Sequence, residues 1–431
     1  MVKLFYHDSF NLERESITLR KYILVKDKLL NENVINKEDV ITPKPITAKD
    51  LLLAHTKEYI DAVRNGEPKP LAESNGIKWG EDVYERAVYS LGSVYQSLES
   101  ALRDGISGSL SSGYHHAHKS HGKGFCTFNY VVPIRKLMQE GKIENALILD
   151  CDVHHPDGTE DCINGDERIV SLSINGTSNF KNKNNKISFG LSLPEGVNYF
   201  RYESILENLM EEAISKQKPS IILYKASQDS HKDDPFGNLK FNTQELFERD
   251  KFVFRYAKSK GIPISFIIGS GYTRPIDISV NGHVNTVKAS KEVEAENIKV
   301  IDYDNPQELS VLSDEMSKDI EGGRIYFVEK LTSRLDRMSG HNLCVGKVFN
   351  PHSQTYFYDI NNNWSKGYCL DSCGLSVLSR NLINEEEFIK NCNKIKVPSD
   401  IQDKAIQLGD KKHLHKELGS LITLSGPMIE N

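Results

Sequence analysis

Three carboxylates and two imidazoles are concentrated in the eight residues from Asp150 to Asp157. The apolar residues 146–149 directly before them indicate a short buried strand, so these polar groups follow the carboxyl end of that strand. In open α/β sheets this edge is where ligands bind. Asp152 and His154 are two residues apart, and side chains alternate along an extended chain, so both point to the same side. One carboxylate oxygen and one imidazole nitrogen placed in this way supply half of a divalent-metal site.

Four elements of the sequence, taken in order, carry a resemblance to a known family. They are a His pair before Gly-Phe-Cys, an Asp-x-Asp-x-His-His run, an Asp before Pro and a Gly-rich loop ending in Tyr, found at residues 115–126, 150–155, 234–235 and 269–272. This combination resembles the zinc-dependent histone deacetylase family and its relatives, the acetoin-utilisation and acetylpolyamine amidohydrolase proteins. The resemblance extends over residues 1–295.

The resemblance implies a single zinc ion held by Asp152, His154 and Asp234. Asp234 is preferred to its neighbour Asp233 because it directly precedes a proline and because Asp229 lies five residues before it, as in the family pattern. Three protein ligands and one open position allow zinc to activate water and to polarise a carbonyl group. Iron or cobalt could bind the same ligands, since N/O donor sets are not strongly selective.

The catalytic groups also follow from the resemblance. His115 and His116 would take a proton from the attacking water and return it to the leaving amine, which suits a group whose pKa is near neutral. Asp150 would support His115 and Asp157 would support His116, whereas Tyr272 would donate a hydrogen bond to the substrate carbonyl and then to the oxyanion.

The resemblance further implies a narrow tunnel for an acyl-lysine side chain and a structural potassium ion. Gly124 and Phe125 would form one wall of the tunnel, and Phe180 would face them. The potassium ligands would be the residues Asp150, Asp152, His154, Ser171 and Leu172.

The sequence departs from the family pattern in three places. Pro156 replaces the usual Gly, Ser270 replaces the middle Gly of the Gly-rich loop, and Ser173 replaces a frequent His.

Arginase-type enzymes share the fold but bind two manganese ions. The positions that would supply carboxylates for their second metal are Pro156 and His231 here, which favours one metal.

Composition indicates a globular protein that stays in a reducing compartment. The 431 residues contain 38% hydrophobic and 26% charged residues and carry a net charge of −6, which argues against a polyanion-binding surface and hence against direct nucleic-acid binding. We find no apolar run long enough to span a membrane and no signal-peptide pattern at the N-terminus. The seven cysteines have no zinc-finger spacing, so we expect a cytoplasmic protein.

The hydrophobic pattern predicts alternating strands and helices. The expected strands are 2–6, 145–150, 168–174, 219–224 and 263–269, and the expected helices are 16–31, 50–64, 81–103, 128–140, 199–216 and 243–259. Residues 105–126 are predicted to be a long loop. Strands separated by single helices indicate an α/β fold, here an arginase/deacetylase-like parallel sheet with helices on both faces.

The sequence predicts a deacetylase domain over 1–300 and a C-terminal α/β extension of unknown role over 301–431, with strands at 343–350 and 355–360 and a helix at 384–393. Within the extension, His341 and Asp359 resemble the His-Asp half of a papain-like protease, although no upstream Cys is free to be its nucleophile.

We therefore expect an amidohydrolase that removes acetyl or other acyl groups from lysine side chains of proteins, possibly histones. Two alternatives remain open: deacetylation of acetylpolyamines or other small acetylated amines, and a catalytically silent acyl-lysine binding protein. Silent relatives typically lose a ligand, the His pair or the Tyr, all of which this chain retains.

Overall fold

The computed structural model describes residues 2–12, 20–176 and 188–296, and beyond them the backbone of four short strands. An eight-stranded sheet lies at the centre of the first part, and every pair of neighbouring strands is parallel. In spatial order its strands are β2 (Val40–Ile41), β1 (Lys3–Phe5), β3 (Ile106–Ser109), β8 (Ile264–Ile268), β7 (Ile222–Ala226), β4 (Ala146–Asp150), β5 (Ile169–Gly176) and β6 (Ser188–Leu193). The predicted α/β class with a parallel sheet is confirmed.

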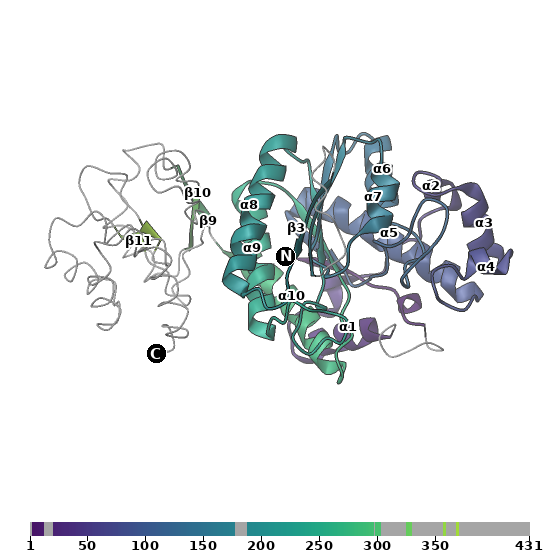
Figure 1. The fold of residues 1–431 in the computed structure, drawn as a ribbon, viewed down its shortest axis with the longest axis horizontal. Helices are drawn as coiled ribbons and strands as arrows, with labels where there is room; N and C mark the ends of the chain where they lie inside the picture. Colours follow the sequence, from purple (N-terminus) through teal and green to yellow (C-terminus); the bar gives the residue numbers. More distant parts are fainter. Residues whose placement is uncertain are drawn as a thin grey trace, which may run out of the picture. The chain divides into compact units, whose positions relative to one another are not determined.

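Helices cover both faces of this sheet (Figure 1). One face carries α8 (Tyr199–Gln217), α9 (Thr243–Ser259) and α10 (Asp277–Ala295), and α1 (Lys21–Asn31) packs against α10. The other face carries α5 (Glu81–Asp104), α6 (Val131–Gln139) and α7 (Asp157–Ile163). The helices α2 (Ala48–Leu51), α3 (Lys57–Asn65) and α4 (Lys69–Ala72) lie beyond α5.

The helix expected over 50–64 is wrong, because this segment forms two helices, α2 and α3. The first of them, α2, begins with a capping box: the Asp50 amide donates to Thr47 Oγ1 at 3.2 Å and the Thr47 amide donates to Asp50 Oδ2 at 3.0 Å. A second N-cap then opens α3, since Thr56 Oγ1 accepts from the Tyr59 amide. The Thr56 amide donates to the Lys119 carbonyl, so the break attaches this segment to the His-rich loop.

The loop expected over 105–126 begins with a strand, β3, which the hydrophobic pattern did not reveal. Its sequence, Ile-Ser-Gly-Ser, is poor in apolar side chains but fully buried. Ser107 Oγ donates to the Ser97 carbonyl of α5, and Ser109 Oγ is 2.5 Å from Ser93 Oγ. A Cβ atom on Gly108 would lie 2.2 Å from the Phe266 ring, so small residues are needed for this close packing.

The remaining expected strands and helices of the first part are present within a few residues of their predicted bounds, except that residues 16–19 of the helix expected over 16–31 lie outside the described residues. The elements β2, β6, α4, α7 and α10 were not predicted. The strands β4, β7 and β8 are buried at every residue, as the continuous apolar runs of a parallel sheet covered on both faces require.

The chain divides into two compact units, residues 1–295 and 296–431. In the second unit, β9 (Ile298–Asp302) pairs in parallel with β10 (Ile325–Glu329), and β11 (Phe357–Tyr358) pairs in antiparallel with β12 (Tyr368–Cys369). The strand β11 lies within the expected strand 355–360. The expected elements 343–350 and 384–393, together with His341 and Asp359, lie outside the described residues.

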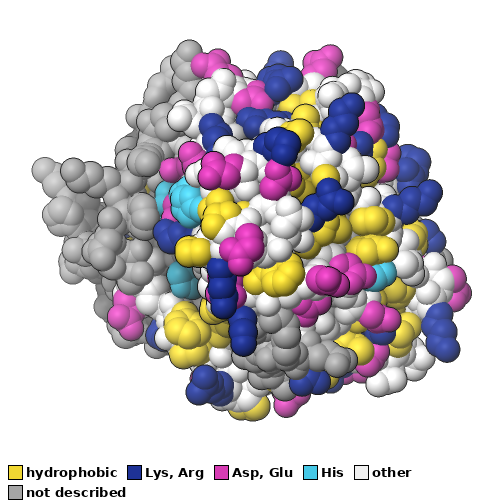
Figure 2. Space-filling view, turned by 90° about the vertical axis from the view of Figure 1, so that its right-hand side faces the viewer, with side chains coloured by type: hydrophobic (Ala, Val, Ile, Leu, Met, Phe, Trp, Pro, Cys, Tyr) yellow, Lys and Arg dark blue, Asp and Glu magenta, His cyan; other side chains and the backbone are white. Residues whose placement is uncertain are grey.

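Among the described residues, no helix is both long and apolar enough to cross a membrane. On the face of the first unit that Figure 2 shows, acidic, basic and hydrophobic side chains are interspersed, without a broad patch of one sign.

Candidate active site

The polar side chains singled out in the sequence follow four strands that are neighbours in the sheet. The order β3-β8-β7-β4 places the ends of these strands side by side, and Asp150 at the end of β4 is in register with Lys225 of β7. Because all four strands run in the same direction, the segments that follow them converge at one edge of the sheet.

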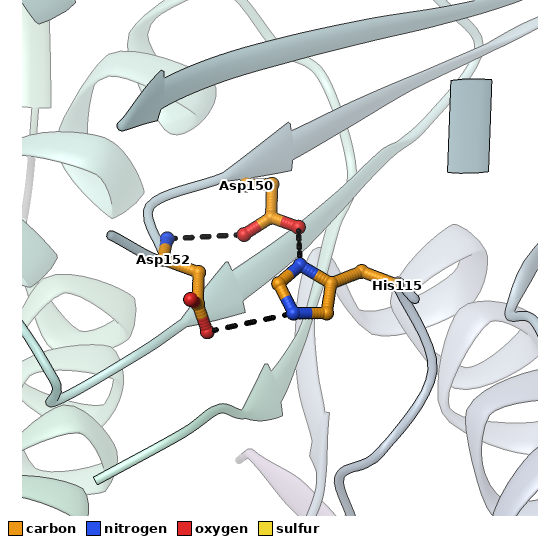
Figure 3. Close-up of side chains that lie close together, drawn as sticks. All are labelled: His115, Asp150 and Asp152. Carbon is orange, nitrogen blue, oxygen red and sulfur yellow. Dashed lines mark hydrogen bonds and ion pairs between the residues drawn. The ribbon is translucent and has the colours of Figure 1, made fainter. Parts of the chain in front are cut away.

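His115 lies between two carboxylates from the end of β4 (Figure 3). Its Nδ1 is 3.0 Å from Asp150 Oδ2, and its Nε2 is 3.9 Å from Asp152 Oδ2. Asp150 is fully buried and also accepts hydrogen bonds from the Tyr130 hydroxyl and the Asp152 amide. Burial alone would raise the pKa of Asp150, but Lys225 and His115 outweigh it, so the pKa lies below its ordinary value.

His116 has its own carboxylate partner and stands beside His115. Its Nδ1 is 2.7 Å from Asp157 Oδ1, and the two imidazole rings are 3.9 Å apart. Burial, reinforced by His115, lowers the pKa of His116 to about 4 although Asp157 opposes the shift. Asp157 also pairs with Lys123 and lies 3.5 Å from His118 Nε2. Both His–Asp pairs expected from the resemblance are thus close enough to hydrogen-bond.

A group of possible metal ligands lies next to these pairs. The ligand atoms of Asp152, His154 and Asp229 are all within 4.8 Å of one another. His154 Nδ1 is 2.9 Å from Asp152 Oδ1 and 3.2 Å from Asp229 Oδ2. Two ligands of one zinc ion, each about 2.0–2.2 Å from the metal, are separated by a similar distance. Two carboxylates and one imidazole therefore fit a divalent ion with three protein ligands.

Asp229 entered the sequence argument only as a spacing marker, yet it belongs to this group, whereas Asp234 belongs to neither group of possible ligands among the described residues. Asp234 is buried, and its two carboxylate oxygens accept from the amides of Tyr272 at 2.7 Å and Phe236 at 2.9 Å. Asp234 thereby attaches the Asp-Pro segment to the loop that carries Tyr272. Burial raises the pKa of Asp234 above its ordinary value. Burial and the neighbouring negative charge of Asp152 together raise the pKa of Asp229 to about 7.

Tyr272 reaches the site from the loop after β8. It is partly buried, and its ring meets the exposed ring of Phe236 edge-on at 5.3 Å. Burial raises the pKa of the Tyr272 phenol well above its ordinary value, so the phenol remains protonated and able to donate.

Two buried lysines at the site were missed in the sequence. Lys225 of β7 pairs with Asp152 Oδ2, lies 3.8 Å from Asp150 Oδ1 and is 3.3 Å from each ring nitrogen of His115. Burial lowers the pKa of Lys225, but Asp150 and Asp152 outweigh it and hold the pKa above its ordinary value. The sequence does show one unusual feature here, because the charged residue Lys225 interrupts the otherwise apolar strand that precedes Asp229.

The second buried lysine, Lys21 at the start of α1, holds the Gly-rich loop. Its Nζ donates to the Gly269 carbonyl at 2.8 Å and to the Gly271 carbonyl at 3.5 Å, and it lies 5.7 Å from the centre of the Tyr272 ring. Burial lowers the pKa of Lys21 to about 8, although the negative charge of Asp229 acts to raise it.

The tunnel residues are partly described. Gly124 lies against His116, since a Cβ atom on it would be 2.7 Å from His116 Cδ2. Phe125 is 47% exposed and has φ of 62°, a left-handed conformation that is unusual for a bulky residue and is typical of functional sites. Phe180 lies outside the described residues.

The expected potassium ligands are largely occupied by protein donors. Asn175 Nδ2 donates to the carbonyl oxygens of His154 at 3.1 Å and of Asp152 at 3.3 Å. Lys225 faces the carboxylates of Asp150 and Asp152. Ser171 Oγ is buried and has no hydrogen-bond partner in the described part of the chain, and Leu172 is buried beside it in β5. These residues therefore do not form a set of free oxygen ligands for potassium.

His–Asp pairs beside a largely buried group of possible metal ligands, at the carboxyl edge of a parallel sheet, define a class of metal-dependent hydrolases. Sequence comparison identifies the member of this class: the profile of the histone deacetylase domain matches residues 17–287, and the chain belongs to the histone deacetylase family. It is accordingly a metal-binding hydrolase of acetyl-amide bonds.

Several relatives are similar to this chain. An uncharacterized protein of Picosynechococcus sp. is 30% identical over 65% of this chain and 94% of its own length. The acetoin utilization protein AcuC of Staphylococcus aureus is 25% identical over 53% of this chain and 65% of its own length. Histone deacetylase 2 of Arabidopsis thaliana is 23% identical over 57% of this chain and 66% of its own length. The chain thus spans about two thirds of the last two relatives.

Proposed function

We propose that this chain removes acetyl groups from the lysine side chains of proteins, with histone tails among the candidate substrates. The observation that carries the proposal is the pair of imidazole–carboxylate contacts, His115–Asp150 and His116–Asp157, next to the metal-ligand group. A binding protein has no need for two imidazoles held by carboxylates at such a position, whereas amide hydrolysis needs groups that move protons.

One zinc ion per chain is the proposed cofactor, held by Asp152, His154 and a second carboxylate. The family resemblance implies that this carboxylate is Asp234, and the short distance between Asp229 and His154 makes Asp229 the competing donor. When bound, zinc supplies Lewis acidity, which lowers the pKa of water and polarises a carbonyl group.

The chain's own residues perform the proton transfers. His116 takes a proton from the attacking water at its Nε2, because Asp157 occupies Nδ1, and then returns it to the leaving amine. His115 is held in the same way by Asp150 and supports the charge that develops beside it. Tyr272 keeps its proton and donates a hydrogen bond to the acyl oxygen as negative charge forms there.

The substrate is best tested with the purified, zinc-loaded chain. Acetyl-lysine peptides, including histone-tail sequences, should be compared with longer acyl-lysine peptides and acetylated polyamines, with His116→Ala and a chelator as controls. We expect the highest kcat/KM for acetyl-lysine peptides and a loss of most turnover in His116→Ala with its zinc retained. Preference for acetylated polyamines would replace the proposed substrate, and binding without turnover of any substrate would indicate an acyl-lysine binding protein.

A further inference from the structure

We propose that Lys225 and Asn175 take the place of a structural potassium ion, so that the site holds one divalent ion and no monovalent one. This inference rests on the metal site of the proposed function, but it concerns the groups around that site rather than the reaction.

Lys225 supplies a positive charge where buried carboxylates need one. Asp150 and Asp152 are both fully buried, and an isolated carboxylate removed from water in this way is strongly destabilising unless a cation accompanies it. Lys225 is only 1% exposed, and its ammonium pairs with Asp152 and lies 3.8 Å from Asp150. The cation that accompanies the carboxylates of Asp150 and Asp152 is therefore a side chain of the protein and not a bound ion.

Asn175 satisfies the oxygen atoms that an ion would otherwise use. Its Nδ2 donates to the carbonyls of Asp152 and His154, whereas its Oδ1 accepts from Ser173 Oγ at 3.2 Å. A hard cation held by oxygen typically takes about six or more ligands. Asn175 already binds the two carbonyls, and Lys225 already pairs with the carboxylates of Asp150 and Asp152. Of the ligands expected for potassium, this leaves Ser171 Oγ and the Leu172 carbonyl.

The test uses the purified, zinc-loaded full chain at constant ionic strength in potassium chloride or choline chloride. We expect no potassium in elemental analysis of the desalted protein and the same unfolding temperature in both salts. Stoichiometric bound potassium, or an unfolding temperature that rises saturably with potassium, would overturn the proposal.

Two variants assign the role to these residues. Lys225→Met should unfold roughly 10 °C below wild type in choline chloride, because it leaves buried carboxylates unpaired, and potassium should restore part of that loss. Lys251→Met is the matched control, since Lys251 is a largely buried lysine paired with Glu292 at 2.7 Å on a helix outside the site. This control should gain nothing from potassium. Equal stability of Lys225→Met and wild type in choline chloride would contradict the proposal.

Where Lys225→Met does not fold, Asn175→Ala replaces it. This variant frees the carbonyls of Asp152 and His154 and should acquire an unfolding temperature that rises with potassium. None of these measurements uses turnover, so a chain inactive on every acyl substrate would refute the proposed function and leave this result standing.

Discussion

At the scale of single residues, Tyr272 distinguishes a hydrolase from a binding protein. Its phenol stays protonated because burial raises its pKa, and it stands on a loop that Asp234 and Lys21 hold. Tyr272→Phe removes one oxyanion donor and keeps the ring. We expect turnover of acetyl-lysine peptides to fall by roughly 100- to 1000-fold with a much smaller change in KM. An unchanged kcat would show that the phenol takes no part in the reaction.

The third metal ligand can be identified by comparing two matched variants. Asp229→Asn and Asp234→Asn each remove one buried carboxylate charge and keep the shape of the side chain. The variant of the true ligand should lose most of its bound zinc in elemental analysis, whereas the other should retain it with reduced turnover. Retention of stoichiometric zinc by both variants would contradict a three-ligand site that includes either residue.

His55 makes the stability of the fold depend on pH. Its Nδ1 donates to the His118 carbonyl and its Nε2 accepts from the Asn129 amide, both at 2.9 Å, so the folded protein requires a neutral ring. Burial is the main reason that the pKa of His55 is lowered from 6.5 to about 4, and the charge of Arg135 acts in the same direction. The backbone hydrogen bonds and Asp161 act to raise the pKa, but their effect is smaller.

Because the folded pKa of His55 is depressed, protons bind the unfolded chain first. The stability that its neutral ring contributes is complete above pH 6.5 and is lost as the pH falls towards 4, by up to about 1.4 kcal/mol per pH unit. Urea unfolding at several pH values should show a steeper decline for wild type than for His55→Gln. Parallel curves for the two proteins would exclude this role for His55.

The sequence predicted which side chains would lie together where a motif constrains residue types, whereas their roles stay predictions. His115, His116, Asp150, Asp157 and the Asp152–His154 pair meet as expected, because a motif fixes both the residue types and their spacing. Lys225 and Asn175 belong to no such motif. The sequence shows that Lys225 interrupts an apolar strand, but its role depends on partners from other strands, and one sequence does not show which strands become neighbours.

At the scale of elements, the start of α7 fixes the His-rich loop in place. The Thr159 amide donates to the His115 carbonyl at 3.0 Å, and a Cβ atom on Gly158 would lie 2.5 Å from the Ala117 carbonyl oxygen. Gly158→Ala should therefore push the loop away from Asp157. We expect a loss of about 1–3 kcal/mol in the free energy of unfolding and a clear loss of turnover.

Gly190→Ala in β6 is the control for that substitution, because its new Cβ would meet only Ser173 Oγ, at an ordinary 3.4 Å. It should unfold and turn over like wild type. If both substitutions behave alike in urea unfolding and kinetics, the contact between α7 and the His-rich loop does not constrain the site.

Long helices and apolar strands were predicted within a few residues, since their periodicity and caps are local features. The helix α9 has the predicted bounds, Thr243–Ser259. The strand β3 was missed because its stability depends on serine contacts with α5 and on space beside Phe266, both of which are tertiary features. The break between α2 and α3 was missed for a similar reason, since Thr56 is anchored by distant Lys119.

At the scale of the whole molecule, the deacetylase domain is predicted to work without the extension. The described site residues and all eight strands of the large sheet belong to residues 1–295, whereas β9 pairs with β10. A chain ending at residue 296 should keep a cooperative thermal transition and a kcat/KM for acetyl-lysine peptides close to that of the full chain. A folded but inactive shortened chain would show that the extension contributes to the site.

The order of the strands has a consequence for how the protein is made. The strands β1, β2 and β3 pair with one another, as do β4, β5 and β6, but the two groups are joined only through β7 and β8. During translation each group therefore keeps an unpaired strand edge until β8, which ends at residue 268, has left the ribosome. At roughly 5–20 residues per second, β8 is synthesised on the order of ten seconds after β4. His115 belongs to the first group and Asp150 to the second, so nascent chains pass through a period of exposed strand edges, with its risk of aggregation, before the His115–Asp150 pair can form.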